Sequence, residues 1–161
     1  MDYSSPTGRS LTVKRFLDKY GHSALKIKSS QTVTEAAAAF ADSEHGRRYS
    51  MAAVVDDGDR VCGVLSLGDI VFALSQHREH LFEMSVASIM TKDPHTATLN
   101  DDLLQVLQRM AELEVRHMPV VEDGVLLGLV TRKDALEGLY HAAALEIEDM
   151  THFVFRSGAR Y

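Results

Sequence analysis

Residues 116–134 read RHMPVVEDGVLLGLVTRKD, and this stretch decides the fold of the chain. Two apolar runs, residues 118–121 and 125–130, flank an Asp-Gly turn. Runs rich in β-branched residues on either side of such a turn are typical of a β-hairpin. The T-x-x-D sequence at residues 131–134 has the spacing of a helix N-terminus, so it predicts a helix from about residue 135.

The same pattern occurs earlier, in residues 51–69, which read MAAVVDDGDRVCGVLSLGD. Corresponding residues lie 66 positions apart before the turn and 65 apart after it, so the first turn is one residue longer. Both copies end in [ST]-x-x-D, with Ser66 and Asp69 in the first and Thr131 and Asp134 in the second. An internal duplication of this kind predicts two structural repeats.

The composition is that of a globular protein, with one domain or two small repeats that share a core. The chain has 161 residues, of which 45% are hydrophobic and 25% are charged. A net charge of −6 argues against nucleic acid as a partner. The single cysteine, Cys62, cannot form an internal disulfide, which fits a reducing cytoplasm. No apolar run reaches the roughly 20 residues of a membrane span, and residues 1–10 are polar, so we expect a cytoplasmic protein that does not contact membrane.

A short strand and a helix are predicted before each hairpin. In the first copy, residues 24–27 favour the strand and residues 32–35 (TVTE) form a capping box for the helix. In the second copy, residues 95–98 favour the strand and residues 102–105 form the matching cap. These helices are offset by 70 positions, four more than the hairpins, which predicts a surface insertion within residues 44–48.

Two further helices flank the repeats. Residues 12–20 have apolar residues at helical spacing, and Gly21 follows as a C-cap. After Asp134 the apolar period continues to about Met150, and this long helix needs a partner for its apolar face, either the N-terminal helix or another subunit. The expected organisation is an N-terminal tail and helix (1–21), a first repeat and linker (22–83), a second repeat with an extended helix (84–150) and a C-terminal tail (151–161).

Each repeat therefore has the order β-α-β-β-α, which belongs to the α+β class. This order, with PVVEDG at residues 119–124 and G-[LV]-[LV]-[ST]-x-x-D closing each unit, resembles the CBS domain, a family named after cystathionine β-synthase. The resemblance covers about residues 24–74 and 86–140. It implies that two repeats pack about a pseudo-two-fold axis and leave clefts for adenosine-type ligands: AMP, ADP, ATP, S-adenosylmethionine or NAD. It also implies a homodimer that regulates another protein.

The resemblance points to the second copy as the better nucleotide site. Asp134 would accept hydrogen bonds from the ribose hydroxyls, and Thr131 would contact ribose or phosphate. Spacing alone fits a helix N-cap with an acid in the first turn as well. Lys133 and Arg132 would contact phosphate at a helix N-terminus that favours anions, and a solvated charged face is the alternative.

The family pattern also supplies a purine wall. It places Met118, Pro119 and Val120 against the base, and ordinary core packing is the alternative. Thr96 borders the purine in this pattern, and Arg116 is a candidate phosphate contact or a surface residue. The first copy lacks the basic pair and is expected to form a weaker site, from Ser66, Asp69, Ala52, Ala53 and Lys26.

The sequence therefore predicts a non-catalytic regulatory module that binds an adenine nucleotide between its repeats and requires no cofactor. The alternative is a dimerisation or scaffold module with vestigial ligand sites. We do not expect an enzyme, because no nucleophile or phosphate-binding motif is present. The eight histidines show no spacing typical of metal ligands, so no metal site is expected.

Overall fold

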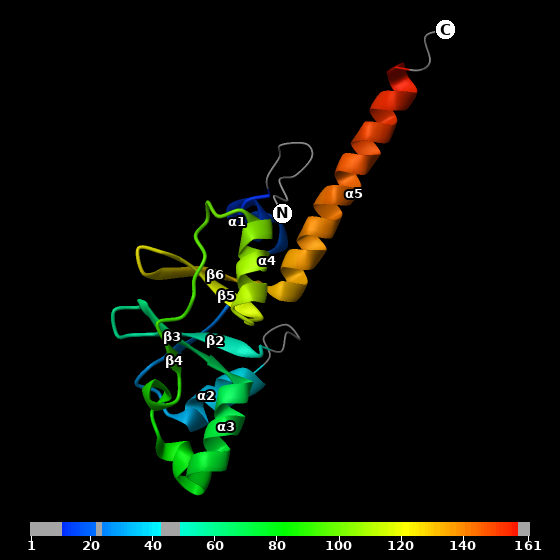
Figure 1. The fold of residues 1–161 in the computed structure, drawn as a ribbon. Helices are drawn as coiled ribbons and strands as arrows, with labels where there is room; N and C mark the ends of the chain where they lie inside the picture. The colour runs from blue at the N-terminus through cyan, green and yellow to red at the C-terminus, as the bar shows by residue number, and fades with distance from the viewer. Residues whose placement is uncertain (1–10, 22–23, 43–48, 158–161) are drawn as a thin grey trace.

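The structure is a computed structural model that describes residues 11–21, 24–42 and 49–157, with the backbone alone for residues 146 and 149–157. Two β-hairpins lie next to each other across the middle of the molecule (Figure 1). Helices α2 and α3 lie on one side of the hairpins, and α1, α4 and the base of α5 lie on the other. The fold is α+β, as predicted. The predicted insertion at residues 44–48 falls outside the described residues.

The first repeat contains a sheet in the order β1-β2-β3-β4. The strand β1 and the antiparallel β2–β3 hairpin confirm the sequence prediction, and the structure adds that β1 pairs with β2 in parallel. The strand β4 comes from residues 84–92, which were predicted to belong to the second repeat and serve here as the linker, and it adds antiparallel to the free edge of β3. The elements of this repeat and its linker are β1 Leu25–Lys28, α2 Val33–Ala41, β2 Met51–Val55, β3 Val61–Ser66, α3 Leu67–His77, the 3-10 helices η2 Arg78–Glu83 and η3 Val86–Ser88, and β4 Thr91–Lys92.

The second repeat consists of α4 Leu103–Glu112, the hairpin β5 His117–Glu122 and β6 Val125–Thr131, and α5 Arg132–Ser157. The strand predicted at residues 95–98 is wrong in extent, because only Ala97 bridges to Val120 in parallel. Ala97 N donates to Pro119 O, and Ala97 O accepts from Val121 N, both at 2.9 Å. The next bond of a parallel ladder would need an N–H at residue 119, and proline has none. The segment therefore takes the position of a strand without forming one.

The two hydrophobic cores are built by exchange between the repeats. Helix α1, Val13–Tyr20, packs Val13, Phe16 and Leu17 into the core of the second repeat, where Phe16 is 2% exposed and the other two are fully buried. Val86 of the linker packs into the core of the first repeat. Each repeat is thus completed by the segment that precedes the other one along the chain. The predicted helix at residues 12–20 is confirmed, with Thr12 as its N-cap and Gly21, at φ 96°, after its last residue.

Helix α5 begins earlier and ends later than predicted. It starts at Arg132, because Thr131 is its cap, and runs to Ser157 through most of the segment expected to be a tail. Figure 1 shows it standing away from the body of the molecule. At its base it contacts α1, where a Cβ on the buried Gly138 would lie 2.9 Å from Cδ2 of Phe16. No described helix combines the length and hydrophobicity needed to cross a membrane.

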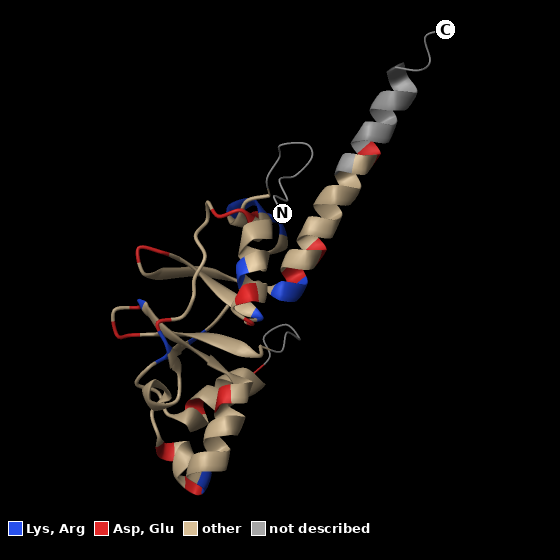
Figure 2. Cartoon of the chain, viewed as in Figure 1, with Lys and Arg blue, Asp and Glu red and all other residues tan. Residues whose placement is uncertain are grey.

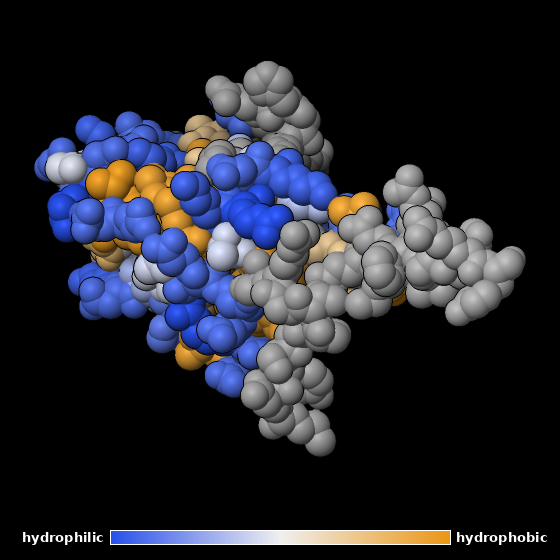
Figure 3. Space-filling view, turned by 90° about the horizontal axis from the view of Figure 1, so that it is seen from above, coloured by the Kyte–Doolittle hydropathy of each residue, from blue (hydrophilic) through white to orange (hydrophobic). Residues whose placement is uncertain are grey.

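Several large apolar side chains remain exposed on the helices. Within its coloured part, α5 has basic residues only in its first turn and acidic residues along its shaft (Figure 2). Seen from above, a band of hydrophobic side chains lies among hydrophilic ones on the surface that is not grey (Figure 3). Helix α1 therefore covers only part of the apolar face of α5 for which a partner was predicted. The most exposed large apolar residues of α3 and α5 are Val71, Phe72, Tyr140 and Ile147.

Candidate functional site

A cleft of about 490 Å³ lies where α1, the start of β2 and the β6–α5 corner meet. This volume is within the range of small-molecule sites in proteins. The lining combines apolar and aromatic groups with hydroxyls, one ammonium, two carboxylates and one imidazole. Its residues are Phe16, Tyr20, Gly21, Tyr49, Ser50, Met51, His117, Leu129, Thr131, Lys133, Asp134 and Glu137.

Three of the predicted site residues come together in this cleft: Thr131, Lys133 and Asp134. The Thr131 hydroxyl caps α5 by accepting from Asp134 N at 3.0 Å. Thr131 does not donate to the Asp134 carboxylate in return, and this carboxylate has no hydrogen-bond partner among the described residues. Asp134 and Lys133 are both exposed, at the N-terminus of a helix whose backbone favours anions. Thr131 therefore serves as the cap, and the carboxylate is left available to the cleft.

The first copy of the motif is closed on itself. Ser66 and Asp69 form a full capping box at the start of α3, with Ser66 N and Ser66 Oγ each donating to Asp69 Oδ2 at 2.7 Å. Asp69 N donates back to Ser66 Oγ at 3.1 Å. Neither residue lines the cleft. The weaker first site predicted from the sequence thus has its carboxylate engaged in holding its own helix.

The remaining predicted residues of the first site are also engaged elsewhere. Ala52 and Ala53 are buried in the first repeat, at 0% and 1% exposure. Lys26 forms an ion pair with Asp59, with Nζ 2.8 Å from Oδ2 and 3.0 Å from Oδ1. This pair ties β1 to the turn of the first hairpin and leaves Lys26 outside the cleft.

Arg132 and Arg116 do not lie among the cleft residues, contrary to the predicted phosphate contacts. The guanidinium of Arg132 turns to the C-terminus of α4, where Nη2 donates to Met110 O and Val115 O, each at 2.9 Å. Met110 lies in the last turn of α4 and its carbonyl also accepts from Val115 N at 3.0 Å, while Val115 follows the helix, so Arg132 ties the end of α4 to the segment that leads into β5. Arg116 is exposed, and its carbonyl accepts from Arg132 N at 2.9 Å.

The predicted purine wall is core rather than cleft lining. Met118, Pro119 and Val120 are all buried, and Met118 and Val120 belong to the core of the second repeat. Thr96 is exposed and lies outside the cleft, where its carbonyl accepts from Arg109 Nη2 at 3.4 Å. The alternating side chains of a strand explain the placement of Met118 and Val120, which share the face opposite to His117; Pro119 shares the face of His117 but lies further along the strand, outside the cleft lining.

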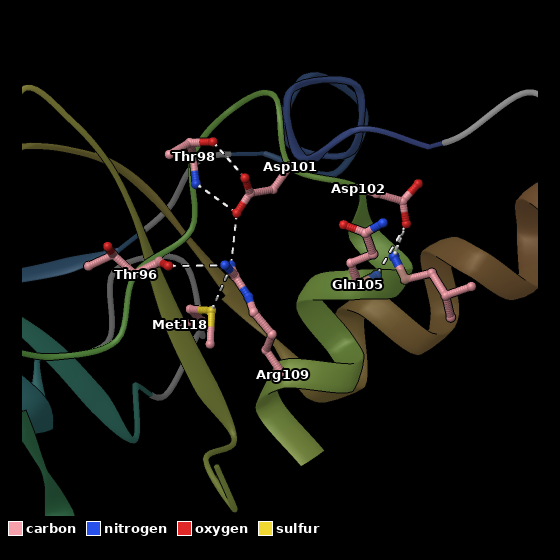
Figure 4. Close-up of polar contacts among 8 residues, drawn as sticks. Thr96, Thr98, Asp101, Asp102, Gln105, Arg109 and Met118 are labelled. Atoms are coloured by element: carbon pink, nitrogen blue, oxygen red, sulfur yellow. Dashed lines mark hydrogen bonds and ion pairs between the residues drawn. The ribbon is translucent and has the colours of Figure 1, made fainter. Parts of the chain in front are cut away.

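A polar network around Arg109 supports this side of the second repeat (Figure 4). From α4, Arg109 Nη2 donates to Asp101 Oδ2 at 2.8 Å and approaches Met118 Sδ at 3.7 Å. Asp101 also accepts from Thr98 Oγ1 at 2.8 Å. Burial raises the pKa of Asp101, but hydrogen bonds from Thr98 and the charge of Arg109 outweigh it and lower that pKa overall. The network anchors the segment that carries Thr96 onto α4.

One hydrogen bond crosses the cleft between the repeats. Ser50 Oγ, just before β2, lies 3.1 Å from His117 Nε2, at the start of β5. His117 is half-buried, and its pKa is lowered by burial and by the charge of Arg116, while the nearby Asp134 carboxylate raises it. The pKa of this imidazole lies below its usual value overall, so the ring is neutral near neutral pH.

The sequence reasoning missed several cleft residues. Ser50, Tyr49 and Met51 come from the other repeat, and Phe16 and Tyr20 come from α1, which packs on the second repeat only in three dimensions. Glu137 lies one turn after Lys133 and Asp134, so helical spacing was a usable signal for it. The Tyr20 hydroxyl is buried at the cleft and has no hydrogen-bond partner among the described residues. The part of the chain that the structure describes holds no cluster of three or more metal-binding side chains.

The sequence and the fold are both similar to those of known proteins. The chain is 32% identical over 139 residues to the CBS domain-containing protein CBSCBSPB1 of Arabidopsis thaliana. It spans 24% of the length of that relative and 21% of the next ones, so those proteins contain much more than this module.

Two of the solved structures that share the fold hold ligands. The CBS domain pair of protein MJ0100, in complex with 5'-methylthioadenosine and S-adenosyl-L-methionine, matches with a TM-score of 0.68 and 23% identity, over 84% of this chain and 99% of that one. The CBS domain protein PAE2072 from Pyrobaculum aerophilum, complexed with AMP, matches with a TM-score of 0.65 and 21% identity, over 77% and 89%.

The family model of the CBS domain matches twice, at residues 20–76 and 86–141. These two matches cover the two repeats described above, including both hairpins and both [ST]-x-x-D motifs. The chain therefore belongs to the CBS-domain family and carries a tandem pair of its repeats.

Proposed function

We propose that this chain is a non-catalytic regulatory module that binds an adenine nucleotide, AMP, ADP or ATP, in the cleft between its two repeats. The observation that carries the proposal is the set of Thr131, Lys133 and Asp134 around the cleft, with a carboxylate that has no hydrogen-bond partner among the described residues. S-adenosylmethionine and NAD share the adenosine group and are the further candidate ligands. The proposal includes a partner protein or second copy of the chain that responds to the bound state.

The chemistry of the lining fits the three parts of a nucleotide. Asp134 can accept charge-assisted hydrogen bonds from two ribose hydroxyls. Lys133 and the N-terminus of α5 favour a phosphate group. Tyr20 offers aromatic surface for the base, backed by the buried ring of Phe16 at a centroid distance of 5.1 Å, and the Tyr20 hydroxyl offers a polar contact.

The structural relatives support the ligand class. MJ0100 holds two adenosine derivatives and PAE2072 holds AMP, and both share the fold of this chain at low sequence identity. The charge of the cleft lining favours some of the candidate nucleotides over others. The described lining has one cation, Lys133, against Asp134 and Glu137, so we expect AMP to bind more tightly than ATP.

The experiment compares two aspartates that occupy the same motif position. Asp134→Ala is expected to abolish AMP binding measured by calorimetry and to cost no more than the helix-dipole contribution of about 0.3–1 kcal/mol, because its carboxylate caps nothing among the described residues. Asp69→Ala is the matched control and should keep AMP binding while losing about 1 kcal/mol of stability, because its capping box is broken. Unchanged AMP affinity in Asp134→Ala would move the site elsewhere.

A second candidate function is a dimerisation or scaffold module. It is favoured by the apolar side chains exposed on the last helix of each repeat, among them Val71 and Phe72 on α3 and Leu136 and Tyr140 on α5. Light scattering on the full chain distinguishes the two functions when it is combined with calorimetry. A dimer that gives no heat with AMP, ADP, ATP, NAD or S-adenosylmethionine would support the scaffold alone.

A further inference from the structure

The hydrogen bond between Ser50 and His117 joins the two repeats at the cleft. Ser50 Oγ and His117 Nε2 are 3.1 Å apart, and both residues line the cavity. The two residues also adjoin the helices that close the repeats. Ser50 O accepts from Leu67 N, at the start of α3, and Arg116 O accepts from Arg132 N, at the start of α5. Any rearrangement of this hydrogen bond therefore acts where both helices begin.

Charged and titratable groups face His117 from every element around it. Helix α5 contributes Lys133, Asp134 and Glu137 to the cleft, and Arg116 precedes His117 along the chain. Burial and Arg116 lower the pKa of His117, and Asp134 raises it. The remaining titratable groups of the cleft are two phenols, Tyr20 of α1 and Tyr49 before β2.

A neutral imidazole and a protonated one make different hydrogen bonds. The neutral ring has one nitrogen that donates and one that accepts, so Nε2 can accept the Ser50 hydroxyl hydrogen. In the protonated ring both nitrogens donate, and Nε2 can only donate to Ser50 Oγ. Protonation at His117 thus frees the Ser50 hydroxyl hydrogen for another acceptor in the cleft.

We propose that a nucleotide phosphate bound in the cleft is accompanied by uptake of a proton at His117, and that Ser50 then donates its hydroxyl hydrogen to a phosphate oxygen. The proton comes from solvent, and no covalent bond forms or breaks apart from the new N–H. An anion beside the imidazole favours its charged form, which offsets the effect of burial and of Arg116. This inference rests on the proposed function, because it requires the phosphate to occupy this cleft.

The sign of the pH dependence follows from linkage. If binding takes up a proton, affinity rises as pH falls through the pKa of His117 in the complex. A rise of one unit in the pKa of His117 on binding corresponds to about tenfold in affinity between the two pH limits. The phosphate of AMP also titrates near pH 6, and Lys133 favours its dianion, so that group alone would release protons on binding. The two contributions have opposite signs and can be separated by mutation.

The test is calorimetry of AMP with the full chain, near neutral pH, in two buffers of different ionisation enthalpy. We expect net proton uptake with the unmodified chain and none with adenosine, which lacks the phosphate. His117→Gln should convert the uptake for AMP into no exchange or release, and His95→Gln, at an exposed histidine outside the cleft, should keep it. Uptake that persists in His117→Gln would overturn the inference while leaving the nucleotide site in place.

A second variant keeps the inference testable if His117→Gln does not fold. Ser50→Ala should weaken AMP binding several-fold and leave adenosine binding unchanged, because only the phosphate loses a donor. Equal affinity of Ser50→Ala and the unmodified chain for AMP would overturn the inference. If the unmodified chain binds neither AMP nor adenosine, the proposed function itself fails, and the inference fails with it.

Discussion

Replacing Gly138 by alanine is expected to destabilise the protein, although glycine-to-alanine changes inside helices usually stabilise. Alanine gains about 1 kcal/mol over glycine in a helix interior. At Gly138, however, the new Cβ would lie 2.9 Å from Cδ2 and 3.0 Å from Cε2 of Phe16. The Phe16 ring is 2% exposed and belongs to the core of the second repeat, so it has little room to move. Overpacking of this kind costs about 1–3 kcal/mol, which leaves a net loss of about 1 kcal/mol.

Gly68 in α3 provides the matched control for this prediction. A Cβ there meets only Ser66 Oγ at 3.4 Å, an ordinary contact, so Gly68→Ala should raise stability by up to about 1 kcal/mol. Urea denaturation followed by circular dichroism gives both midpoints in the same conditions. The reasoning is refuted if Gly138→Ala raises the midpoint as Gly68→Ala does. Such a result would mean that α1 lies on α5 loosely enough to shift, and that the cleft wall formed by Phe16 is not fixed.

Two further predictions concern stability. Arg132→Met should cost about 2 kcal/mol in urea denaturation, because Met110 O and Val115 O each lose a charged donor, and Arg132→Lys should recover only part of it. Recovery of full stability in Arg132→Lys would contradict a role for the guanidinium in bridging the two carbonyls. The Thr32 backbone and side-chain hydrogen bonds lower the pKa of Glu35, so its contribution to stability is present above the usual carboxyl pKa and is lost as pH falls through the lowered value. Glu35→Gln should therefore make the acid side of the stability–pH curve flatter, and an unchanged curve would show that the capping box does not carry this linkage.

The hairpins and helices could be predicted because their signals are local. An Asp-Gly turn, an N-cap or a C-cap glycine each specify structure within a few residues: both hairpins formed, Thr32 and Asp102 both cap their helices, and Gly21 follows the end of α1. The short strand before α4 failed for a reason that was also present in the sequence. Pro119 stands where the partner strand would have to donate the next ladder bond, and the first copy has Ala53 there.

The cleft could be predicted only in part, because its lining depends on helix phase and on long-range packing. Arg132 and Lys133 look alike in the sequence, but neighbouring helical residues point about 100° apart. Arg132 consequently faces the end of α4, and Lys133 faces the cleft. The sequence could not place Phe16 and Tyr20 at the cleft. The apolar face of residues 12–20 predicts burial, but it does not indicate that the second repeat is the partner.

The two copies of [ST]-x-x-D differ in whether the acid takes part in the cap, and this difference bears on which copy suits the proposed nucleotide. At Asp69, a ribose hydroxyl would have to replace hydrogen bonds at 2.7 Å from Ser66 N and Oγ, and losing such a cap costs about 1 kcal/mol or more. At Asp134 there is no such cost, since only the backbone N–H of this residue takes part in the cap. A difference of one to two kcal/mol corresponds to a factor of about 5–30 in affinity. The same cap chemistry that closes α3 therefore disfavours a nucleotide at the first copy, and the one-sided cap of α5 leaves the second carboxylate free to bind it.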